Sequence, residues 1–412
     1  MKLKLHWQIL IAIALGIAMG ALSRLFHFED LVIDYISVLG TIFIRALRMI
    51  VVPLIIASII SGVTSMGETS SFGRMSTKTF GYYITTTLLA TTTGLIMVNL
   101  IVPGEGLSLN MGVVPEGIQA NTEKLGETLL GIIPTNPIAA MAEGKMLPII
   151  FFSLLFGYFI LRSTDPHRKQ LTDLFGGIFQ VMMKMTHMVI LFTPIGVFAL
   201  MGKIVAQTGY EVFVPMLAYM LTVFGSLMIH ALITLPLIIS IFAGINPLAH
   251  FKAMSTALLT AFSLASSSAT LPLTMDNLEN NAGISNRVTS FVAPLGATIN
   301  MDGTALYECV AAIFIAQVYG IELSFMQQFI VVITALLASI GAAGVPMAGL
   351  VMMTIILNAV GLPLEGIGLI LAVDRILDMV RSSVNVWSDS CGTVLIAKSE
   401  GETQIKVLAN KA

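Results

Sequence analysis

Apolar runs long enough to cross a lipid bilayer occupy most of this chain. The first, from Trp7 to about Leu22, contains no charged residue, and similar runs recur to the end of the sequence. Of the 412 residues, 56% are hydrophobic and only 11% are charged, whereas a soluble domain needs roughly 25% charged residues to cover its surface. The chain is therefore predicted to be an all-α polytopic membrane protein, with residues 1–412 forming a single integrated membrane domain.

Eight membrane spans are expected at about 20 residues per crossing, and several are long enough that they must tilt or bend. The spans lie near residues 8–26, 35–66, 78–102, 128–161, 175–207, 211–243, 287–319 and 364–397. Lysine and arginine recur on one side, while residues 105–127 form an acidic connection on the other. Because basic connections stay in the cytoplasm, both termini are expected there, in a multi-pass protein of the cell membrane. The net charge of −2 argues against nucleic acid as a partner.

Two further apolar segments, residues 253–279 and 329–357, are each interrupted at the middle by small residues and a proline. Each is predicted to be a re-entrant helical hairpin, with Pro272 or Pro346 near the start of its second arm. The order hairpin, span, hairpin, span forms an inverted repeat, because the first hairpin would enter from inside and the second from outside. Paired interrupted segments of this kind point to a transporter site near the membrane midplane.

The span at 287–319 contains its own interruption. Asn300 and Asp302 lie between Gly296 and Gly303 in otherwise apolar sequence, so the helix is expected to unwind there. A break supplies backbone carbonyls, an amide and a carboxylate, and hard cations such as Na⁺ prefer oxygen ligands. The alternative, a polar kink bonded to a neighbouring helix, stays open at this point.

The last span carries a stripe of polar residues on one face, within a sector of about 100°. Its members are Asp374, Asp378, Arg381, Ser382, Asn385 and Asp389. A charge at a helix centre costs roughly 2.5–3.5 kcal/mol on insertion scales, so something must bind the stripe. The three aspartates of the stripe outnumber the two arginines of this helix, Arg375 and Arg381. Asp302 and Glu308 increase the excess of negative charge. The imbalance favours bound cations over a purely structural salt-bridge network, although that network is the alternative.

Four motifs, "SSSATLP", "PLGATINMDGTALYE", "ASIGAAGVPMAG" and "DMVRSSVNVWSD", occur in this order. In order and spacing they resemble the glutamate transporter family, the dicarboxylate/amino acid:cation symporters. "IIPTNPIAAMAEGKMLPIIFF" and "TPIGVFAL" extend the resemblance upstream. The resemblance implies a homotrimer that works by an elevator movement. It implies a trimerisation scaffold at approximately 1–70 and 128–210, and a transport part at approximately 77–102 and 211–400.

The resemblance also implies roles for individual residues. Arg381 would hold the side-chain carboxylate of the substrate and Asp378 its amino group. Further substrate contacts would come from Ser266, Ser267, Ser268, Thr304, Gly344, Val345, Ser382 and Asn385. Sodium would be bound at one site by Tyr83, Thr86, Thr87, Asn300 and Asp302, at another by Gly296, Asn385 and Asp389, and at a third near Ser339.

Glu308 is the expected proton carrier, because it is ionisable at depth and, by resemblance, glutamate here marks the proton-coupled members. The alternative is a permanent pair with Arg381 or Arg375. Family members usually hold an additional arginine where this chain has Ala265 or Met379. Arg375 is a candidate substitute, and potassium counter-transport is left open.

The resulting prediction is a sodium-driven, also proton-coupled, symporter of L-glutamate or L-aspartate, and not an enzyme. A neutral amino acid or C4-dicarboxylate transporter of the same fold is the alternative. A pure anion channel would not need so closed a set of ligands, and a hydrolase would need a base beside the serines of 266–268. The six histidines lack metal spacing and are interpreted as structural.

Overall fold

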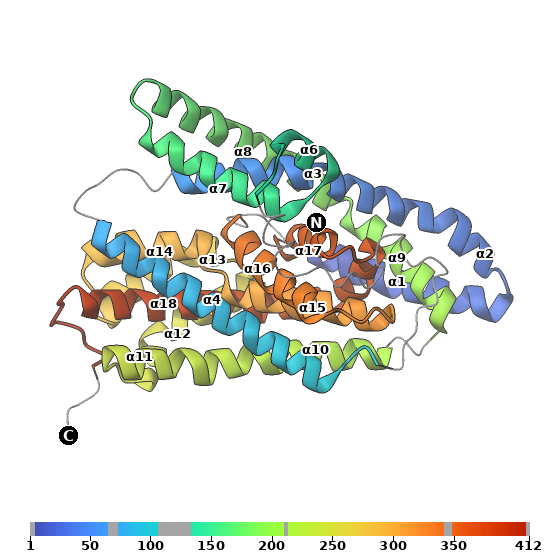
Figure 1. The fold of residues 1–412 in the computed structure, drawn as a ribbon. Coiled ribbons are helices and arrows are strands. Elements are labelled where there is room, and N and C mark those ends of the chain that lie inside the picture. Colours follow the sequence, from blue (N-terminus) through green and yellow to red (C-terminus); the bar gives the residue numbers. More distant parts are fainter. Residues whose placement is uncertain (1–4, 65–72, 106–132, 210–212, 342–347, 409–412) are drawn as a thin grey trace.

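The computed structural model describes residues 5–64, 73–105, 133–209, 213–341 and 348–408. In these ranges all regular structure is helical, apart from one isolated antiparallel bridge between Ile245 and Leu408. Most helices run along the long axis of the molecule in layers (Figure 1). The predicted all-α class is confirmed.

One group of helices forms the upper and right-hand part of Figure 1. Its members are α1 (Leu5–Phe26), α2 (Glu29–Leu31), η1 (Val32–Ile36), α3 (Ser37–Thr64), α6 (Pro137–Glu143), α7 (Met146–Arg162), α8 (His167–Leu191) and α9 (Thr193–Thr208). Helix α1 packs along α9, and α3 packs against α7, α8 and α9. Glycine permits the close approach of α1, because a Cβ on Gly16 would lie 2.6 Å from the carbonyl oxygen of Phe198.

The second group surrounds α15 (Asp302–Val318), in which every residue except Gln317 is buried. The other members are α4 (Gly73–Ile101), α10 (Phe213–Ile229), η3 (His230–Thr234), α11 (Leu235–Ala243), α12 (Pro247–Leu264), α13 (Ser267–Asp276), η4 (Asn277–Asn281), α14 (Asn286–Ile299), α16 (Phe325–Gly341), α17 (Ala348–Ala359), η5 (Leu364–Gly366) and α18 (Ile367–Ser399). Helices α4, α10, α16, α17 and α18 all pack on α15. Ionisable residues on α15 therefore lie deep in the protein.

Two of the expected spans are each divided into two helices. Within the span expected at 128–161, α6 ends at Glu143 and is followed by Gly144, whose φ of 69° is left-handed, and α7 begins at Met146. The span expected at 175–207 is divided at Phe192. There Pro194 sits in the first turn of α9, where its missing N–H costs no hydrogen bond. Local backbone chemistry thus overrides the continuous apolar pattern.

The predicted interruptions agree with the structure wherever it describes them. The span expected at 287–319 is split into α14 and α15 by Asn300 and Met301. The hairpin expected at 253–279 turns at Ala265, which has φ of 50° and separates α12 from α13. Pro272 lies inside α13 rather than at its start. Helices α16 and α17 flank the second expected turn, whose residues 342–347 lie outside the described part.

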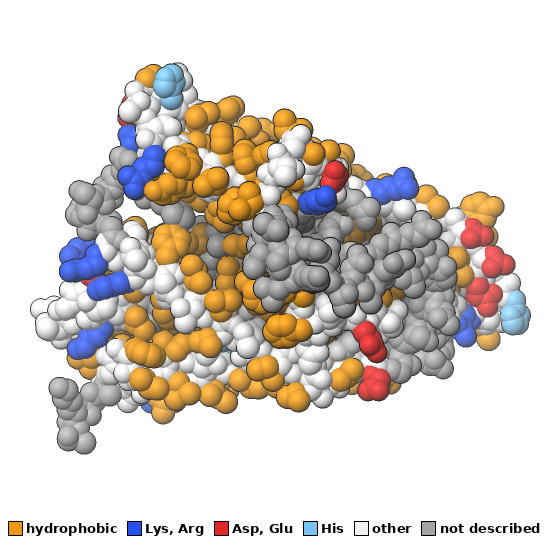
Figure 2. All heavy atoms as spheres, in the orientation of Figure 1, with side chains coloured by type: hydrophobic (Ala, Val, Ile, Leu, Met, Phe, Trp, Pro, Cys, Tyr) orange, Lys and Arg blue, Asp and Glu red, His pale blue; other side chains and the backbone are white. Residues whose placement is uncertain are grey.

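The surface matches a protein that crosses a bilayer several times. Six helical segments in the described ranges are long and apolar enough to span a membrane. Hydrophobic side chains cover the flank in Figure 2, while basic side chains gather at the end with the α7–α8 connection and the start of α4. Acidic side chains gather at the opposite end, around α2. The molecule is a multi-pass helical membrane protein.

Candidate substrate- and cation-binding site

The break between α14 and α15 lies directly against α18. The backbone N–H of Gly303 donates to Oδ1 of Asn385 at 2.8 Å, and Nδ2 of Asn385 donates to Oγ1 of Thr304 at 3.1 Å. A Cβ on Gly303 would lie 2.7 Å from the carbonyl oxygen of Arg381. Glycine is therefore required where the start of α15 meets the polar stripe of α18.

Asp302 is the best-connected carboxylate in this region, and it is fully buried. Its Oδ1 accepts from the hydroxyls of Thr87 at 2.6 Å and Thr86 at 3.3 Å. Its Oδ2 accepts from Ser388 Oγ at 2.5 Å. The structure thus brings Asp302 together with two of its predicted sodium-site partners from α4, and it adds Ser388.

Asp389 forms a second oxygen-rich cluster next to the first. Nδ2 of Asn300 donates both to Oδ1 of Asp389 at 2.9 Å and to Ser388 Oγ at 3.1 Å. A Cβ on Gly296 would lie 2.5 Å from Oδ1 of Asp389 and 2.8 Å from the hydroxyl of Tyr83. Tyr83, predicted at the Asp302 site, therefore lies beside the Asp389 cluster, and its hydroxyl donates to the carbonyl of Val292 at 2.7 Å. The clusters are linked through Asn300.

Arg381 is the buried cation of the site, with a side chain only 2% exposed. Its Nη1 lies 3.3 Å from Oδ1 of Asp374. Its Nε and Nη2 lie 3.0 and 2.9 Å from Oδ1 of Asp378. Its Cζ lies 4.4 Å from the ring centroid of Tyr307, a cation–π distance. Nη1 of Arg375 lies 3.5 Å from the other oxygen of Asp378. A planar fork is thus held among carboxylates and one aromatic ring.

Helix α17 covers the guanidinium through a glycine that is not among the predicted site residues. A Cβ on Gly349 would lie 2.4 Å from Nη1 and 2.8 Å from Cζ of Arg381. Gly344 and Val345, predicted to close over the substrate, lie outside the described residues. In the described part of this hairpin arm, the missing side chain of Gly349 therefore leaves the space that Arg381 occupies.

Gly349→Ala is expected to lower the affinity for acidic amino acids by about tenfold, because overpacking costs about 1–3 kcal/mol and here displaces Arg381. Titration calorimetry on purified protein measures the change. Gly225→Ala in α10 is the matched control, since its added Cβ would meet no described residue within 4 Å beyond its own helix. Equal affinities of the Gly349 variant and the wild type would contradict the placement of α17 over Arg381.

Glu308 lies within α15 and is fully buried. Among the described residues, neither of its carboxylate oxygens has a hydrogen-bond partner. The ion pairs of Arg381 in this arrangement are with Asp374 and Asp378. Glu308 therefore differs from Asp302, whose oxygens are all occupied by donors.

The three serines of the first hairpin occupy different environments. The Ser266 hydroxyl caps α13 by accepting from the backbone N–H of Ala269 at 3.2 Å. Ser267 is buried, whereas Ser268 is exposed. Their proposed substrate contacts remain predictions.

Two further predicted residues, Ser339 and Ser382, are buried. Ser382 lies on α18, and Ser339 lies on α16, where its hydroxyl donates to the carbonyl of Leu336 at 2.7 Å. The substrate contact of Ser382 and the third sodium site near Ser339 remain predictions.

His230 lies against Asp302 and is not among the predicted site residues, because the histidines were interpreted as structural. Its Nε2 lies 3.2 Å from Oδ2 of Asp302, and both side chains are fully buried. His230 begins the π-helical segment η3, and such widened turns are frequent at functional sites. Trp387 Nε1 donates to the carbonyl of Ala231 in the same segment at 3.0 Å. No histidine spacing along the chain signals this contact.

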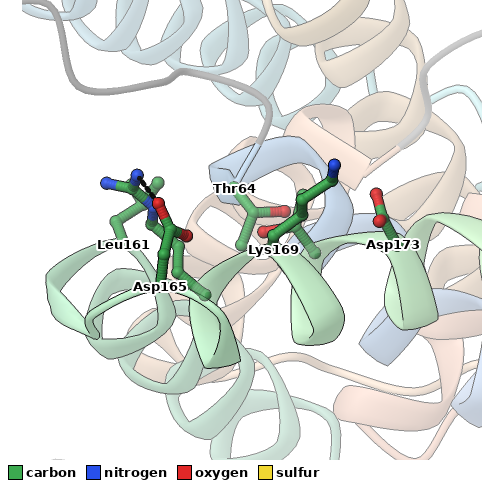
Figure 3. A pocket seen from close by; sticks show the side chains of 7 residues that line it. Thr64, Leu161, Asp165, Lys169 and Asp173 are labelled. Carbon is green, nitrogen blue, oxygen red and sulfur yellow. Dashed lines mark hydrogen bonds and ion pairs between the residues drawn. The ribbon is translucent and has the colours of Figure 1, made fainter.

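A separate cavity of about 390 Å³ lies where α3 ends and α7 connects to α8 (Figure 3). It is lined by Thr64, Leu161, Asp165, Arg168, Lys169, Thr172 and Asp173. Nη2 of Arg168 lies 2.8 Å from Oδ2 of Asp165. None of these residues belongs to α4, α15 or α18, so the cavity is not part of the site described above.

The interrupted helices bring a buried guanidinium, several carboxylates and hydroxyl oxygens together inside an apolar bundle. This arrangement defines a membrane carrier with an internal polar site. The sodium:dicarboxylate symporter family model matches residues 5–399. The chain therefore belongs to the sodium:dicarboxylate symporter family.

Three relatives illustrate the similarity. The chain is 38% identical to the proton/glutamate-aspartate symporter of Escherichia coli (strain K12), over 97% of this chain and 93% of the relative. It is 35% identical to the proton/sodium-glutamate symport protein of Geobacillus stearothermophilus, over 97% and 96%. It is 37% identical to excitatory amino acid transporter 3 of Mus musculus, over 96% and 86%.

Proposed function

We propose that the protein is a sodium- and proton-coupled secondary active symporter of the acidic amino acids L-glutamate and L-aspartate. The observation that carries the proposal is the buried Arg381 beside Asp378 on one face of α18. An acidic amino acid has a distal carboxylate that matches a planar guanidinium fork and an ammonium group that matches a carboxylate. The names of the three relatives, each a symporter or transporter of acidic amino acids, agree.

Sodium is bound as a co-substrate by the clusters around Asp302 and Asp389. Hydroxyl groups donate one hydrogen and also carry lone pairs, so the threonines that donate to Asp302 can present oxygen to a cation at the same time. The amide of Asn300 connects the two clusters. Cation charge at both positions offsets the excess of buried carboxylates over Arg375 and Arg381. Transport therefore requires sodium because the loaded site is otherwise too acidic to remain buried.

Glu308 carries the co-transported proton. Burial of a carboxylate without a partner is costly, and a bound proton removes that cost. Glu308 also lies beside Tyr307, which stacks on Arg381. The proton site is therefore close in sequence to the residues that hold the substrate fork.

The architecture follows the same proposal. Eight membrane-crossing segments and two re-entrant hairpins form inverted repeats, and both termini lie in the cytoplasm of a protein in the cell membrane. The charge distribution in Figure 2 supports this orientation, with basic side chains at one end and acidic ones at the other. Residues 1–70 and 128–210 act as the scaffold of a homotrimer, and residues 77–102 and 211–400 move as an elevator. The packing of α1, α3, α7, α8 and α9 on one another supports the division.

Uptake by purified protein in liposomes tests the proposed function. An inward sodium gradient is expected to drive accumulation of radiolabelled L-glutamate or L-aspartate, and protein-free liposomes are the control. Unlabelled L-serine and succinate are expected to compete at least about tenfold less well than L-glutamate or L-aspartate. L-Serine lacks the distal carboxylate that Arg381 binds, and succinate lacks the ammonium group that Asp378 binds. Strong competition by serine would favour a neutral amino acid carrier, and strong competition by succinate a C4-dicarboxylate carrier. Absence of accumulation under a sodium gradient would exclude the proposal.

A further inference from the structure

The continuous helix made by α10, η3 and α11 loses a backbone hydrogen bond at the widened turn η3. The backbone N–H of Leu235 donates to the carbonyl of His230, five residues earlier, and not to that of Ala231, four residues earlier. Pro236, the next residue of α11, has no N–H to donate. The carbonyl of Ala231 has therefore lost its usual backbone donor.

Trp387 of α18 supplies a donor to this carbonyl. Its Nε1 donates to the oxygen of Ala231 at 3.0 Å, and its side chain is only 4% exposed. The indole also packs near the start of α12, with ring centres 5.2 Å from His250 and 5.7 Å from Phe251. Trp387 thus joins α18 both to η3 and to the first arm of the first hairpin.

The turn that Trp387 holds places His230 against the carboxylate of Asp302. His230 Nε2 lies 3.2 Å from Oδ2 of Asp302, and it is the donor because an ionised carboxylate can only accept. Ser388, the residue after Trp387, donates to the same oxygen at 2.5 Å. Two donors therefore fix Oδ2, while the threonines of α4 donate to Oδ1. Hydrogen bonds of this kind orient the side chains that bind a metal ion and tune its affinity.

We infer that Trp387 is a positioning residue for sodium binding. It holds the carbonyl of Ala231, fixes the shape of η3, and thereby keeps His230 aimed at Oδ2 of Asp302. This inference rests on the proposed function, which places a sodium ion at the Asp302 cluster, and deepens it. It adds a residue that sets sodium affinity through His230 and not through contact with the ion.

The alternative role for Trp387 is packing alone. A buried indole stabilises the contact between α18 and α12 through its ring, whatever its N–H meets. Loss of that packing would lower the melting temperature of the sodium-free protein without changing its affinity for sodium. Loss of the hydrogen bond to Ala231 is expected to change the affinity for sodium. The sodium affinity therefore distinguishes the two roles.

The test is Trp387→Phe, which keeps an aromatic ring and removes the N–H donor. Without amino acid, the sodium concentration that gives half of the full rise in melting temperature is expected to increase about three- to tenfold, as for one lost hydrogen bond. Calorimetry in saturating sodium is expected to give an affinity for L-aspartate near that of the wild type. Trp7→Phe, the same change at the exposed tryptophan of α1, is the matched control and is expected to keep the wild-type sodium response.

An unchanged sodium response in Trp387→Phe would overturn the inference. An equally large loss of L-aspartate affinity in saturating sodium would show general damage to the site, and would also overturn it. Because phenylalanine is smaller than tryptophan, Trp387→benzothienylalanine provides a second variant, with the shape of the indole and sulfur in place of the N–H. It is expected to reproduce the weaker sodium response, and a wild-type response would assign Trp387 to packing.

A double substitution tests the route through His230. In a His230→Leu background, which lacks the donor to Asp302, Trp387→Phe is expected to cause no further loss of sodium affinity, because residues that act through one another are not additive. A further loss would show that Trp387 acts by another route, and would contradict the inference. The wild type tests the proposed function separately. If sodium produced no rise in the melting temperature of the wild-type protein, the sodium site itself would fail.

Discussion

Arg381→Cys is expected to weaken the binding of L-aspartate and L-glutamate by about 2 kcal/mol or more, roughly thirtyfold, as for the loss of a buried charged hydrogen bond. The buried guanidinium is the group that matches the distal carboxylate, and cysteine leaves a smaller, uncharged side chain. L-Serine and L-alanine are expected to bind the variant better than the wild type, because Asp378 still receives their ammonium group. Calorimetry with all four amino acids in saturating sodium measures the exchange of specificity.

The control for this substitution is Arg287→Cys, at an exposed position at the start of α14. It introduces the same thiol and removes the same charge outside the site, so its affinities are expected to match the wild type. Arg381→Lys is expected to be intermediate, because an ammonium keeps the charge but loses the two-pronged geometry. Normal L-aspartate affinity in Arg381→Cys would mean that the distal carboxylate binds elsewhere.

The helix breaks and the stripe of α18 could be predicted because each is encoded locally. Asn300 lies between glycines in an apolar span, and the small residues around Ala265 mark a turn, so the interruptions at both positions follow from neighbouring residues. The polar face of α18 follows from helical periodicity alone. Short-range pattern was therefore enough to locate the chemistry along the chain.

Contacts between distant elements could not be derived in the same way. Thr87 and Asp302 are 215 positions apart, and only the resemblance to a family paired them. His230 lies in no motif, and Gly349 only ends the motif "ASIGAAGVPMAG" without a predicted role. Their importance appears only when η3 and α17 are placed against Asp302 and Arg381. Periodicity identifies which face of a helix is polar, but it does not identify the element that meets that face.

The divisions within two of the expected spans were not foreseen, for a related reason. The segment at 175–207 is apolar across Phe192, so hydrophobicity alone favours one long helix. A proline in the first turn of α9 begins a new helix without losing a hydrogen bond. An unbroken run of apolar residues indicates that a segment is buried in protein or lipid. It does not show where a helix ends, which a single residue such as proline can decide.

Glu308→Gln is expected to abolish proton coupling while preserving sodium-dependent binding of L-aspartate. Glutamine keeps the size of the side chain and cannot release a proton. Acidification of the liposome lumen during uptake is expected to fall to the level of protein-free liposomes, and the pH dependence of transport is expected to flatten. A pH-sensitive dye inside the liposomes measures the first effect. Glu365→Gln, exposed just before α18, is the matched control and is expected to keep normal acidification.

The contacts of Glu308 favour a carrier over a permanent ion pair. A permanent pair with Arg381 would place the two side chains in contact, yet the guanidinium contacts Asp374 and Asp378 instead. Neither oxygen of Glu308 has a partner among the described residues, so the carboxyl is most stable here with a proton bound. A permanent pair moves no proton, so wild-type uptake without luminal acidification, and indifferent to an imposed pH gradient, would assign Glu308 a structural role.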